Sequence, residues 1–160
     1  MTVPRTPQQN VTTERMNRTL TERARSMHLQ AGLPKQFWAE GVSISAYLIN
    51  RGPSVPLEHI IPEEVWGDKE VKLSHLKVFG CVAYVHVSDQ ARIKLDPKSQ
   101  KCTFLGYGSD DFGYRLWDDK NRKIIRSRDV IFNENVMYNN KDTVYSSDST
   151  QHDPVYVDIF

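Results

Sequence analysis

The sequence contains few cysteines and no long apolar run, and each absence narrows the possible classes of protein. Cys81 and Cys102 are the only cysteines among the 160 residues. With no second pair and no metal-ligand spacing, they predict reduced, partly buried thiols in an intracellular protein, not a disulfide framework. No run approaches the roughly 18 apolar residues that a membrane span needs. The N-terminus lacks the apolar segment of a signal peptide. We therefore expect a protein that is neither secreted nor bound in a membrane.

Charge of both signs is present, but it is distributed unevenly. The formal net charge of the whole chain is only +1, whereas residues 1–35 sum to +4 and residues 133–160 sum to −4. Such asymmetry predicts a basic surface for a polyanion at one end and an acidic, disordered tail at the other. Two solvated faces with no partner explain the charges equally well. The length favours one or two small domains.

The first part of the chain carries a helical pattern. Residues 1–10 hold two prolines and a Gln-Gln-Asn run, and we expect them to be extended. After them, apolar side chains recur at i, i+4, i+11 and i+15, which places them on one face of a helix. Gly32 supplies the stop, because it readily adopts the left-handed conformation of helix ends. The apolar stripe consists of Met16, Leu20, Met27 and Ala31.

A second helix is predicted from Pro34, which suits the first helical turn, to the Gly52-Pro53 pair. It is more apolar than the first helix, and we expect it to be largely buried. Gly41 in its middle costs about 1 kcal/mol relative to alanine, which is tolerable where a neighbouring helix packs closely. Its expected inward face consists of Trp38, Val42, Ser45 and Ile49.

Beyond the helices the pattern changes twice. Residues 52–75 hold three prolines and little periodicity, which predicts a connector with a short helical turn at 63–66. We expect Trp66 to anchor this connector onto a neighbouring element. From residue 76 the period becomes two, with a bend at Gly80. Short strands separated by tight turns are typical of a small antiparallel barrel. The expected strands lie near residues 78–87, 101–107, 114–117 and 123–132.

The segment that leads into the first helix has a distinctive order of polar residues. A Gln-Gln-Asn run ending at Asn10 precedes Glu14 and Arg15, and Asn17 and Arg18 follow. This block resembles the last catalytic block of copia-type retrotransposon integrases. Further segments resemble the same family in order and spacing over some 130 residues. They are residues 33–40, 46–51, 62–66, 73–81, 94–99, 104–107, 113–116 and 124–132.

The resemblance implies a role for Glu14 as the third member of an Asp, Asp, Glu triad that holds Mg²⁺ or Mn²⁺. Such sites use two metal ions, one to activate the attacking hydroxyl and one to stabilise the leaving oxygen. Only thirteen residues precede Glu14, so we expect a truncated fragment without the two aspartates and without catalysis. Val11 and Thr13 stand where the family has glycine and a small residue, which predicts a stiffened loop. Without the resemblance, Glu14 is a first-turn acid that can pair with Arg18.

The resemblance also implies that the first helix lies along DNA. Arginine suits phosphate because its planar fork offers paired donors, and such contacts are weak, sequence-tolerant and salt-sensitive. A solvated basic face remains the alternative. The predicted nucleic-acid-binding residues are Asn10, Arg15, Asn17, Arg18 and Arg25.

The predicted barrel adds aromatic and basic side chains that allow two interpretations each. The aromatic rings can stack on bases or cage methylated lysines, although alternating spacing favours the barrel core. The basic residues can form a second nucleic-acid face or protect edge strands. The aromatic set is Tyr84, His86, Phe104, Tyr107, Tyr114 and Trp117. The basic set is Lys94, Lys98, Lys101, Arg122, Lys123, Arg126 and Arg128.

Together these patterns predict an α+β protein. A helical hairpin, the remnant of a ribonuclease-H-like integrase core, occupies residues 1–51 and a connector residues 52–75. An SH3-like barrel occupies residues 76–133 and a flexible acidic tail residues 134–160. We expect an inactive integrase fragment that binds DNA weakly in the nucleus, with the remainder of an integrase as partner and no small-molecule substrate. An SH3-like module for protein or nucleic acid, and a remnant without function, are the alternatives.

Overall fold

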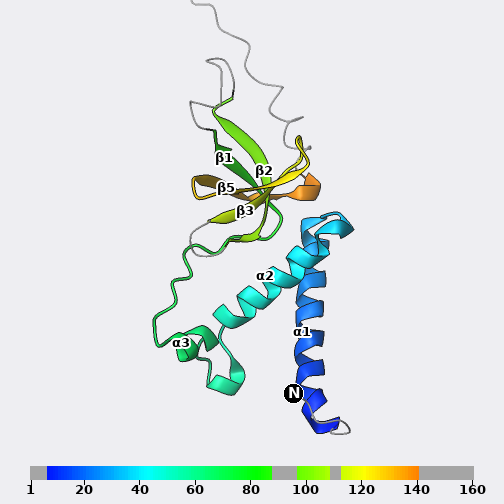
Figure 1. The fold of residues 1–160 in the computed structure, drawn as a ribbon, viewed down its shortest axis with the longest axis vertical. Coiled ribbons are helices and arrows are strands. Elements are labelled where there is room, and N and C mark those ends of the chain that lie inside the picture. The colour runs from blue at the N-terminus through cyan, green and yellow to red at the C-terminus, as the bar shows by residue number, and fades with distance from the viewer. Residues whose placement is uncertain (1–6, 88–96, 109–112, 141–160) are drawn as a thin grey trace, which may run out of the picture.

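A computed structural model describes residues 7–87, 97–108 and 113–140, and the α+β class is confirmed. The helices form one end of the molecule and an antiparallel sheet forms the other (Figure 1). No helix in these ranges is long and apolar enough to cross a membrane. The helices are α1 (Pro7–Ala31), η1 (Lys35–Phe37), α2 (Trp38–Arg51), η2 (Val55–Leu57), α3 (Pro62–Gly67) and η4 (Tyr138–Asn140). The strands are β1 (Cys81–His86), β2 (Ser99–Tyr107), β3 (Tyr114–Asp118), β4 (Lys123–Ser127) and β5 (Val130–Met137).

Helix α1 begins earlier than the sequence predicts. The expectation of an extended segment is wrong for residues 7–10, which are helical, while residues 1–6 lie outside the described residues. Pro7 is compatible with this start because the first amides of a helix have no intrahelical acceptor, so its missing N–H costs nothing. The predicted stop is confirmed, since Gly32 has a φ of +65° and its N–H donates to the His28 carbonyl at 3.1 Å.

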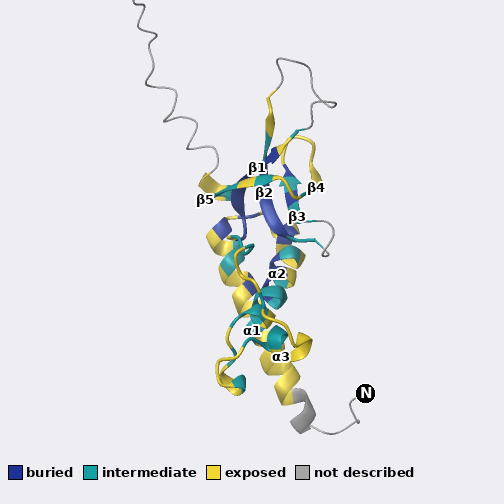
Figure 2. Cartoon of the chain, turned by 90° about the vertical axis from the view of Figure 1, so that its left-hand side faces the viewer, coloured by how far each residue is buried: buried dark blue, intermediate teal, exposed yellow. Residues whose placement is uncertain are grey.

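The apolar stripe of α1 is packed only in the half near the sheet (Figure 2). Ala24 and Ala31 are buried, whereas Met16 is 49% exposed. The backbone of α2 lies close to Ala24 at Gly41, where an added Cβ would stand 3.6 Å from the Ala24 carbonyl oxygen. The expected close approach of a neighbouring helix at Gly41 is therefore confirmed.

The inward face of α2 agrees with the predicted one only in part, because Ser45 is buried as predicted whereas Trp38 is not. Trp38 is 39% exposed, and the buried positions are Gly41, Ile44 and Ser45. The buried Phe37, just before α2, meets Trp117 edge-on with 5.0 Å between ring centroids. Because Phe37 and Ile44 are drawn into the core that α2 shares with the sheet, the helix face that carries Trp38 turns outward.

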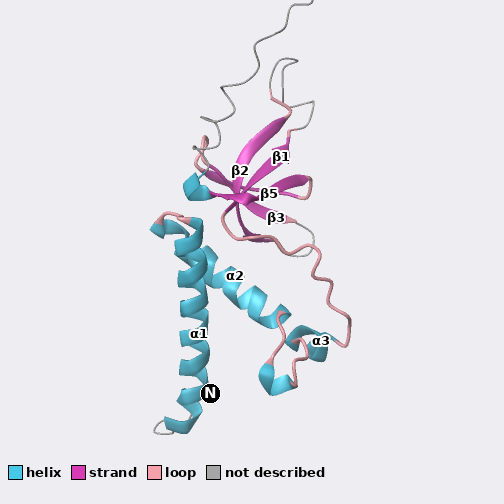
Figure 3. Cartoon of the chain, turned by 180° about the vertical axis from the view of Figure 1, so that it is seen from behind, coloured by secondary structure: helices cyan, strands magenta, loops and turns pink. Residues whose placement is uncertain are grey.

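The sheet has the strand order β4-β3-β2-β1-β5, and every neighbouring pair is antiparallel. Strands predicted at residues 101–107 and 114–117 are confirmed. The predicted run 123–132 is instead two strands, separated by a bend at Arg128 and Asp129. In the described part of the chain, β4 and β5 form the two edges, so the strands predicted to form a small antiparallel barrel form an open sheet. Figure 3 shows it from behind.

Strand β5 continues to Met137, beyond the boundary predicted at residue 133. Glu134 lies on this strand. Its Oε2 accepts a hydrogen bond from the Val78 N–H at 3.1 Å, and its Oε1 lies 3.3 Å from the Lys77 ammonium. The part of the predicted acidic tail from residue 141 onward lies outside the described residues.

One core joins the helices to the sheet. Leu33, Phe37 and Ile44 pack with sheet residues that include Phe104 and Leu116. Gly80 stands at the closest approach, where an added Cβ would lie 2.3 Å from the Ala31 Cβ. Its φ of +79° matches the predicted bend and is readily adopted only by glycine. The end of α1 therefore rests directly on the backbone that leads into β1.

A second link between helix and sheet is electrostatic. The Arg115 Nη2 of β3 lies 2.8 Å from the Glu40 Oε1 of α2, and the two side chains are 27% and 16% exposed. Because both groups are largely shielded from water, their attraction is screened less than that of a surface pair. This contact adds a polar link between α2 and β3 to the apolar core that they share.

The connector, residues 52–75, contains the predicted turn of helix as α3. The prediction that Trp66 anchors it is wrong, because Trp66 is 94% exposed. Polar groups hold the connector instead: Glu63 pairs with Arg51, and the Glu64 Oε1 accepts a hydrogen bond from the Val71 N–H at 3.0 Å. These polar contacts hold α3 without burying Trp66, whose indole stays in solvent.

Candidate nucleic-acid interface

The predicted DNA-binding residues of α1 lie on an exposed helix surface. Arg15, Asn17, Arg18 and Arg25 are all exposed, while the side chain of Asn10 lies outside the description. At 3.6 residues per turn, the three arginines and Glu14 fall within about a third of the helix circumference, opposite the apolar stripe. Asn17 projects from another side, next to the stripe. The structure thus brings together four of the six predicted site residues, a group that we call the basic face.

Arg18 does not pair with Glu14 as the sequence suggested. Its Nε lies 2.8 Å from the Glu22 Oε1, and the two side chains are 81% and 64% exposed. So exposed a pair contributes little to stability, and its geometry leaves the remaining guanidinium donors directed to solvent. The basic face is therefore accessible along its length.

Glu14 does not belong to a metal site in the described part of the chain. Residues 7–87, 97–108 and 113–140 contain no group of three or more His, Cys, Asp or Glu side chains that could hold a metal ion. A two-metal centre needs several carboxylates around the ions. The residues present do not fit Mg²⁺ or Mn²⁺ chemistry at Glu14.

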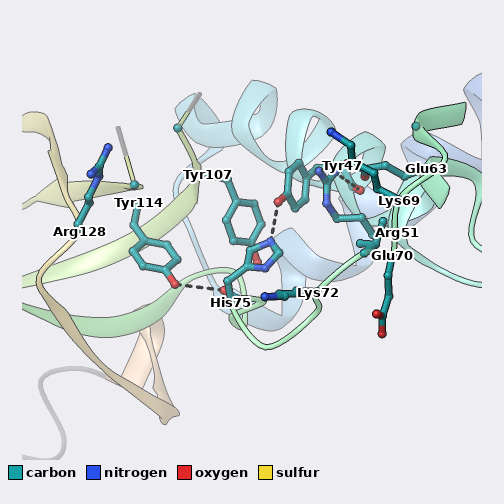
Figure 4. Close-up of a pocket in the computed structure, with 14 residues that line it drawn as sticks. Tyr47, Arg51, Glu63, Lys69, Glu70, Lys72, His75, Tyr107, Tyr114 and Arg128 are labelled. Carbon is teal, nitrogen blue, oxygen red and sulfur yellow. Dashed lines mark hydrogen bonds and ion pairs between the residues drawn. The ribbon is translucent and has the colours of Figure 1, made fainter. Parts of the chain in front are cut away.

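A second surface, a groove of about 590 Å³, lies between α2, the connector and strands β2 and β3 (Figure 4). Its inner wall is a row of half-buried rings from elements far apart in sequence. Tyr47 stacks on Tyr107 with 4.2 Å between centroids, and Tyr114 follows at 6.2 Å from Tyr107. We call this feature the tyrosine groove.

Hydrogen bonds fix the rings of the tyrosine groove. The Tyr47 hydroxyl lies 2.7 Å from the His75 Nε2, and the Tyr114 hydroxyl donates to the His75 carbonyl at 3.3 Å. The Tyr107 hydroxyl accepts from the Lys77 N–H at 2.9 Å. Burial raises the pKa of Tyr107 to about 12. These bonds tie His75, at the end of the connector, to α2 and the sheet, and they tie Lys77, just after the connector, to β2.

Basic side chains surround these rings. The Arg51 guanidinium lies 3.5 Å from the centroid of the Tyr47 ring and pairs with Glu63. Lys69 and Lys72 line the connector side and are exposed, and neither has an ion-pair partner within the described residues. Arg128 lines the groove from the sheet. Among the described residues that line the groove, four are basic and two, Glu63 and Glu70, are acidic.

Most predicted aromatic residues of the sheet serve the core. Phe104 is fully buried, and Tyr107, Tyr114 and Trp117 pack against the same core. Tyr84 is half-buried and His86 is exposed. Tyr107 and Tyr114 also line the groove, so each ring contributes both to the core and to an accessible surface. Of the predicted basic set, Lys123 and Arg126 lie on the edge strand β4, and Lys94 lies outside the described residues.

The sequence did not single out Tyr47, Arg51 or His75 as site residues. Tyr47 and Arg51 fall four residues apart, which places them on one side of a helix, and this spacing was an available signal. His75 carried no such signal, because its position depends on how the connector folds back onto α2.

Comparison with known proteins adds an independent observation. A family model described as the retroviral polymerase SH3-like domain matches residues 81–146. The chain is 61% identical over 133 residues to a retrovirus-related Pol polyprotein from transposon TNT 1-94 of Nicotiana tabacum, covering 83% of this chain and 10% of that protein. It is 33% identical over 132 residues to a Pol polyprotein from transposon RE1 of Arabidopsis thaliana, covering 82% and 9%.

A shorter relative is an uncharacterized mitochondrial protein of Arabidopsis thaliana, 41% identical over 86 residues, which are 54% of this chain and 69% of that protein. No solved structure matches. The chain spans about a tenth of the length of the Pol polyproteins that it matches.

Proposed function

Because this chain belongs to the copia-type retrovirus-related Pol polyproteins of transposons, we propose that it is a piece of an integrase. In this proposal α1 and α2 are the last helices of a ribonuclease-H-like catalytic core, and the sheet is the SH3-like domain that follows it. The ancestral activity is DNA integration by polynucleotidyl transfer. This chain keeps a weak, sequence-tolerant affinity for DNA, without catalysis, and acts in the nucleus.

The observation that carries the proposal is the basic face of α1. Arg15, Arg18 and Arg25 are exposed on the side of the helix opposite the apolar stripe. A helix that presents arginines along one line can contact successive phosphates of a duplex without reading its bases. The affinity should then fall steeply with salt, because each phosphate contact releases a counterion.

Duplex binding tests this proposal directly. Replacing Arg15, Arg18 and Arg25 by glutamine should weaken binding of a fluorescein-labelled 20-base-pair duplex by about tenfold and reduce the salt slope by about three. Anisotropy titrations between about 50 and 200 mM salt give both values. Arg23, Lys35 and Lys120 are exposed and lie off the basic face, and their triple glutamine variant is the charge-matched control. Equal losses in the two variants would refute a specific role for the basic face.

The absence of catalysis is proposed from the surroundings of Glu14. Because the described residues contain no group of three or more metal-ligating side chains, Glu14 has no set of ligands there with which to complete a two-metal site. A strand-transfer assay with Mg²⁺ or Mn²⁺ should detect no product from this chain. Metal-dependent product that disappears in Glu14→Ala would overturn this part of the proposal.

The exposed half of the apolar stripe supports a partner for α1. On the stripe, Met16 is 49% exposed and Leu20 is only half-buried, whereas the half of the helix near the sheet is packed. In a complete integrase core such side chains would cover a sheet. We therefore assign the remainder of an integrase as the protein partner of this surface.

A further inference from the structure

We propose that the tyrosine groove binds a single strand of nucleic acid and packs one of its unpaired bases against the exposed edges of the tyrosine and histidine rings. The site is separate from the basic face of α1. It is built from α2, the connector and the sheet, so it does not depend on the proposed role of α1 in contacting a duplex.

The charge of the groove selects an anionic ligand. Lys69 and Lys72 stand on the connector side, and Arg128 stands across the groove on the sheet side. Glu63, one of the two acidic residues, is already paired with Arg51. A strand that passes between the two sides would therefore meet cations on both of its edges, an arrangement that favours a phosphodiester backbone.

The rings select a ligand that also has a planar part. Tyr47, Tyr107 and Tyr114 are each only half-buried, and His75 lies 5.6 Å from the Tyr107 ring. A base offers a plane of matching size. Stacking on an aromatic face contributes about 1–3 kcal/mol per base, and because Tyr107 and Arg51 already cover the faces of the Tyr47 ring, we expect a gain in the lower part of that range. An acidic peptide would supply negative charge without that plane. A duplex keeps its bases stacked inside the helix, so their faces cannot reach these rings.

The groove is prepared for such a ligand before binding. The contacts of Tyr47 and Tyr114 with His75, at 2.7 and 3.3 Å, hold the rings in place. The ion pair between Arg51 and Glu63 fixes the end of α2 against α3. A site whose walls are already ordered loses little conformational entropy on binding. Its volume of about 590 Å³ lies within the usual range for small-molecule sites, about 300–1,000 Å³.

The test compares two labelled strands of equal length. A 12-nucleotide oligothymidylate and an abasic strand carry the same phosphates, but only the first has bases. By fluorescence anisotropy at low salt, the whole chain should bind the oligothymidylate about tenfold more tightly, the difference that one packed base supplies. Equal affinity for the two strands would overturn the proposal, because it would leave only a charge effect.

Variants locate the site. Lys69→Glu with Lys72→Glu should weaken oligothymidylate binding by about tenfold or more, and both side chains are exposed, so folding should be preserved. Lys35→Glu with Lys120→Glu makes the same change of charge away from the groove and should cost less than about threefold. A groove variant that binds as well as this control would refute the assignment.

The triple glutamine variant of the basic face distinguishes this proposal from that for duplex binding. It should lose duplex affinity and keep the preference for oligothymidylate over the abasic strand. Loss of that preference would place the base on α1 and overturn the groove proposal, whereas unchanged duplex binding would count only against the basic face.

Discussion

Tyr47 contacts three other side chains from a single turn of α2. Its ring stacks on that of Tyr107 with 4.2 Å between centroids. The Arg51 guanidinium lies 3.5 Å from the centroid of the Tyr47 ring, and the Tyr47 hydroxyl lies 2.7 Å from the His75 Nε2. These contacts join α2, the sheet and the connector. Replacing Tyr47 by phenylalanine removes the hydroxyl and keeps the ring, so it tests the contact with His75 while the stacking on Tyr107 remains.

Tyr47→Phe should lower the free energy of unfolding by about 1 kcal/mol, the usual net contribution of one hydrogen bond. Tyr114→Phe is the matched control, because its hydroxyl bond to the His75 carbonyl is longer, at 3.3 Å, and therefore weaker. Urea denaturation followed by circular dichroism measures both. A larger loss in Tyr114→Phe than in Tyr47→Phe would contradict this ranking.

Two buried thiols and the half-buried Tyr107 hydroxyl predict how the stability of the fold changes in alkali. Burial raises the pKa values of Cys81 and Cys102 from 9.0 to about 12, and that of Tyr107 from 10.0 to about 12. Above pH 9 the unfolded chain therefore loses protons that the folded chain retains, so the stability they contribute falls as pH rises from about 9 towards 12. Urea midpoints between pH 8 and 11 should decline. The variant with Cys81→Ala and Cys102→Ala should show a flatter decline, and an identical slope would exclude the thiols as the cause.

At the scale of elements, the joint between α1 and the sheet depends on one glycine. Gly80→Ala should destabilise the protein by about 2–5 kcal/mol, through a strained left-handed backbone and overpacking against Ala31. Gly67→Ala in α3 is the control, since an added Cβ there meets no atom within 4 Å, and its effect should be within about 0.5 kcal/mol. Thermal and urea denaturation give the comparison. Similar losses at the two positions would show that the joint is not tightly packed.

The sequence predicts those elements whose determinants are local. Gly32 ends α1, the 63–66 turn forms within α3, and the strands at 101–107 and 114–117 follow their alternating pattern. The bend at Arg128 and Asp129 was missed because β-branched and charged residues continue through it without a glycine or proline. Trp66 was misplaced because its size predicted burial, whereas the inward contacts of α3 are made by glutamates.

The candidate site was predictable to a similar extent. The arginines of the basic face share a helix face because of their spacing alone. The tyrosine groove brings together Tyr47, His75 and Tyr114, which are separated by 28 and 39 residues. No local pattern contains that information, since it depends on the path of the connector.

In the molecule as a whole, packing decreases with distance from the sheet. The sheet and the adjoining ends of α1 and α2 contain the buried residues, whereas residues 11–18 of α1 are exposed throughout (Figure 2). Helices without tertiary packing are only marginally stable in water. The free energy of local opening should therefore fall along α1 from Ala31 towards Pro7.

Amide hydrogen exchange measures this gradient. Residues 102–106 of β2, which are buried, should exchange only by global unfolding, and residues 24–31 should follow closely. Residues 11–18 should exchange through local fraying, at least about tenfold faster. Uniform protection along α1 would show that the helix is stabilised independently of its contact with the sheet.

The outward position of Trp66 gives this protein an internal optical reporter. Its indole stands 94% exposed on the far side of the Arg51–Glu63 ion pair from the tyrosine groove, whereas Trp117 packs on the core. Iodide in solution should therefore quench the emission of Trp66 preferentially. In a variant that keeps Trp66 while Trp38 and Trp117 are replaced by phenylalanine, a change in tryptophan emission would report binding of a ligand or partner beside α3 without any attached dye.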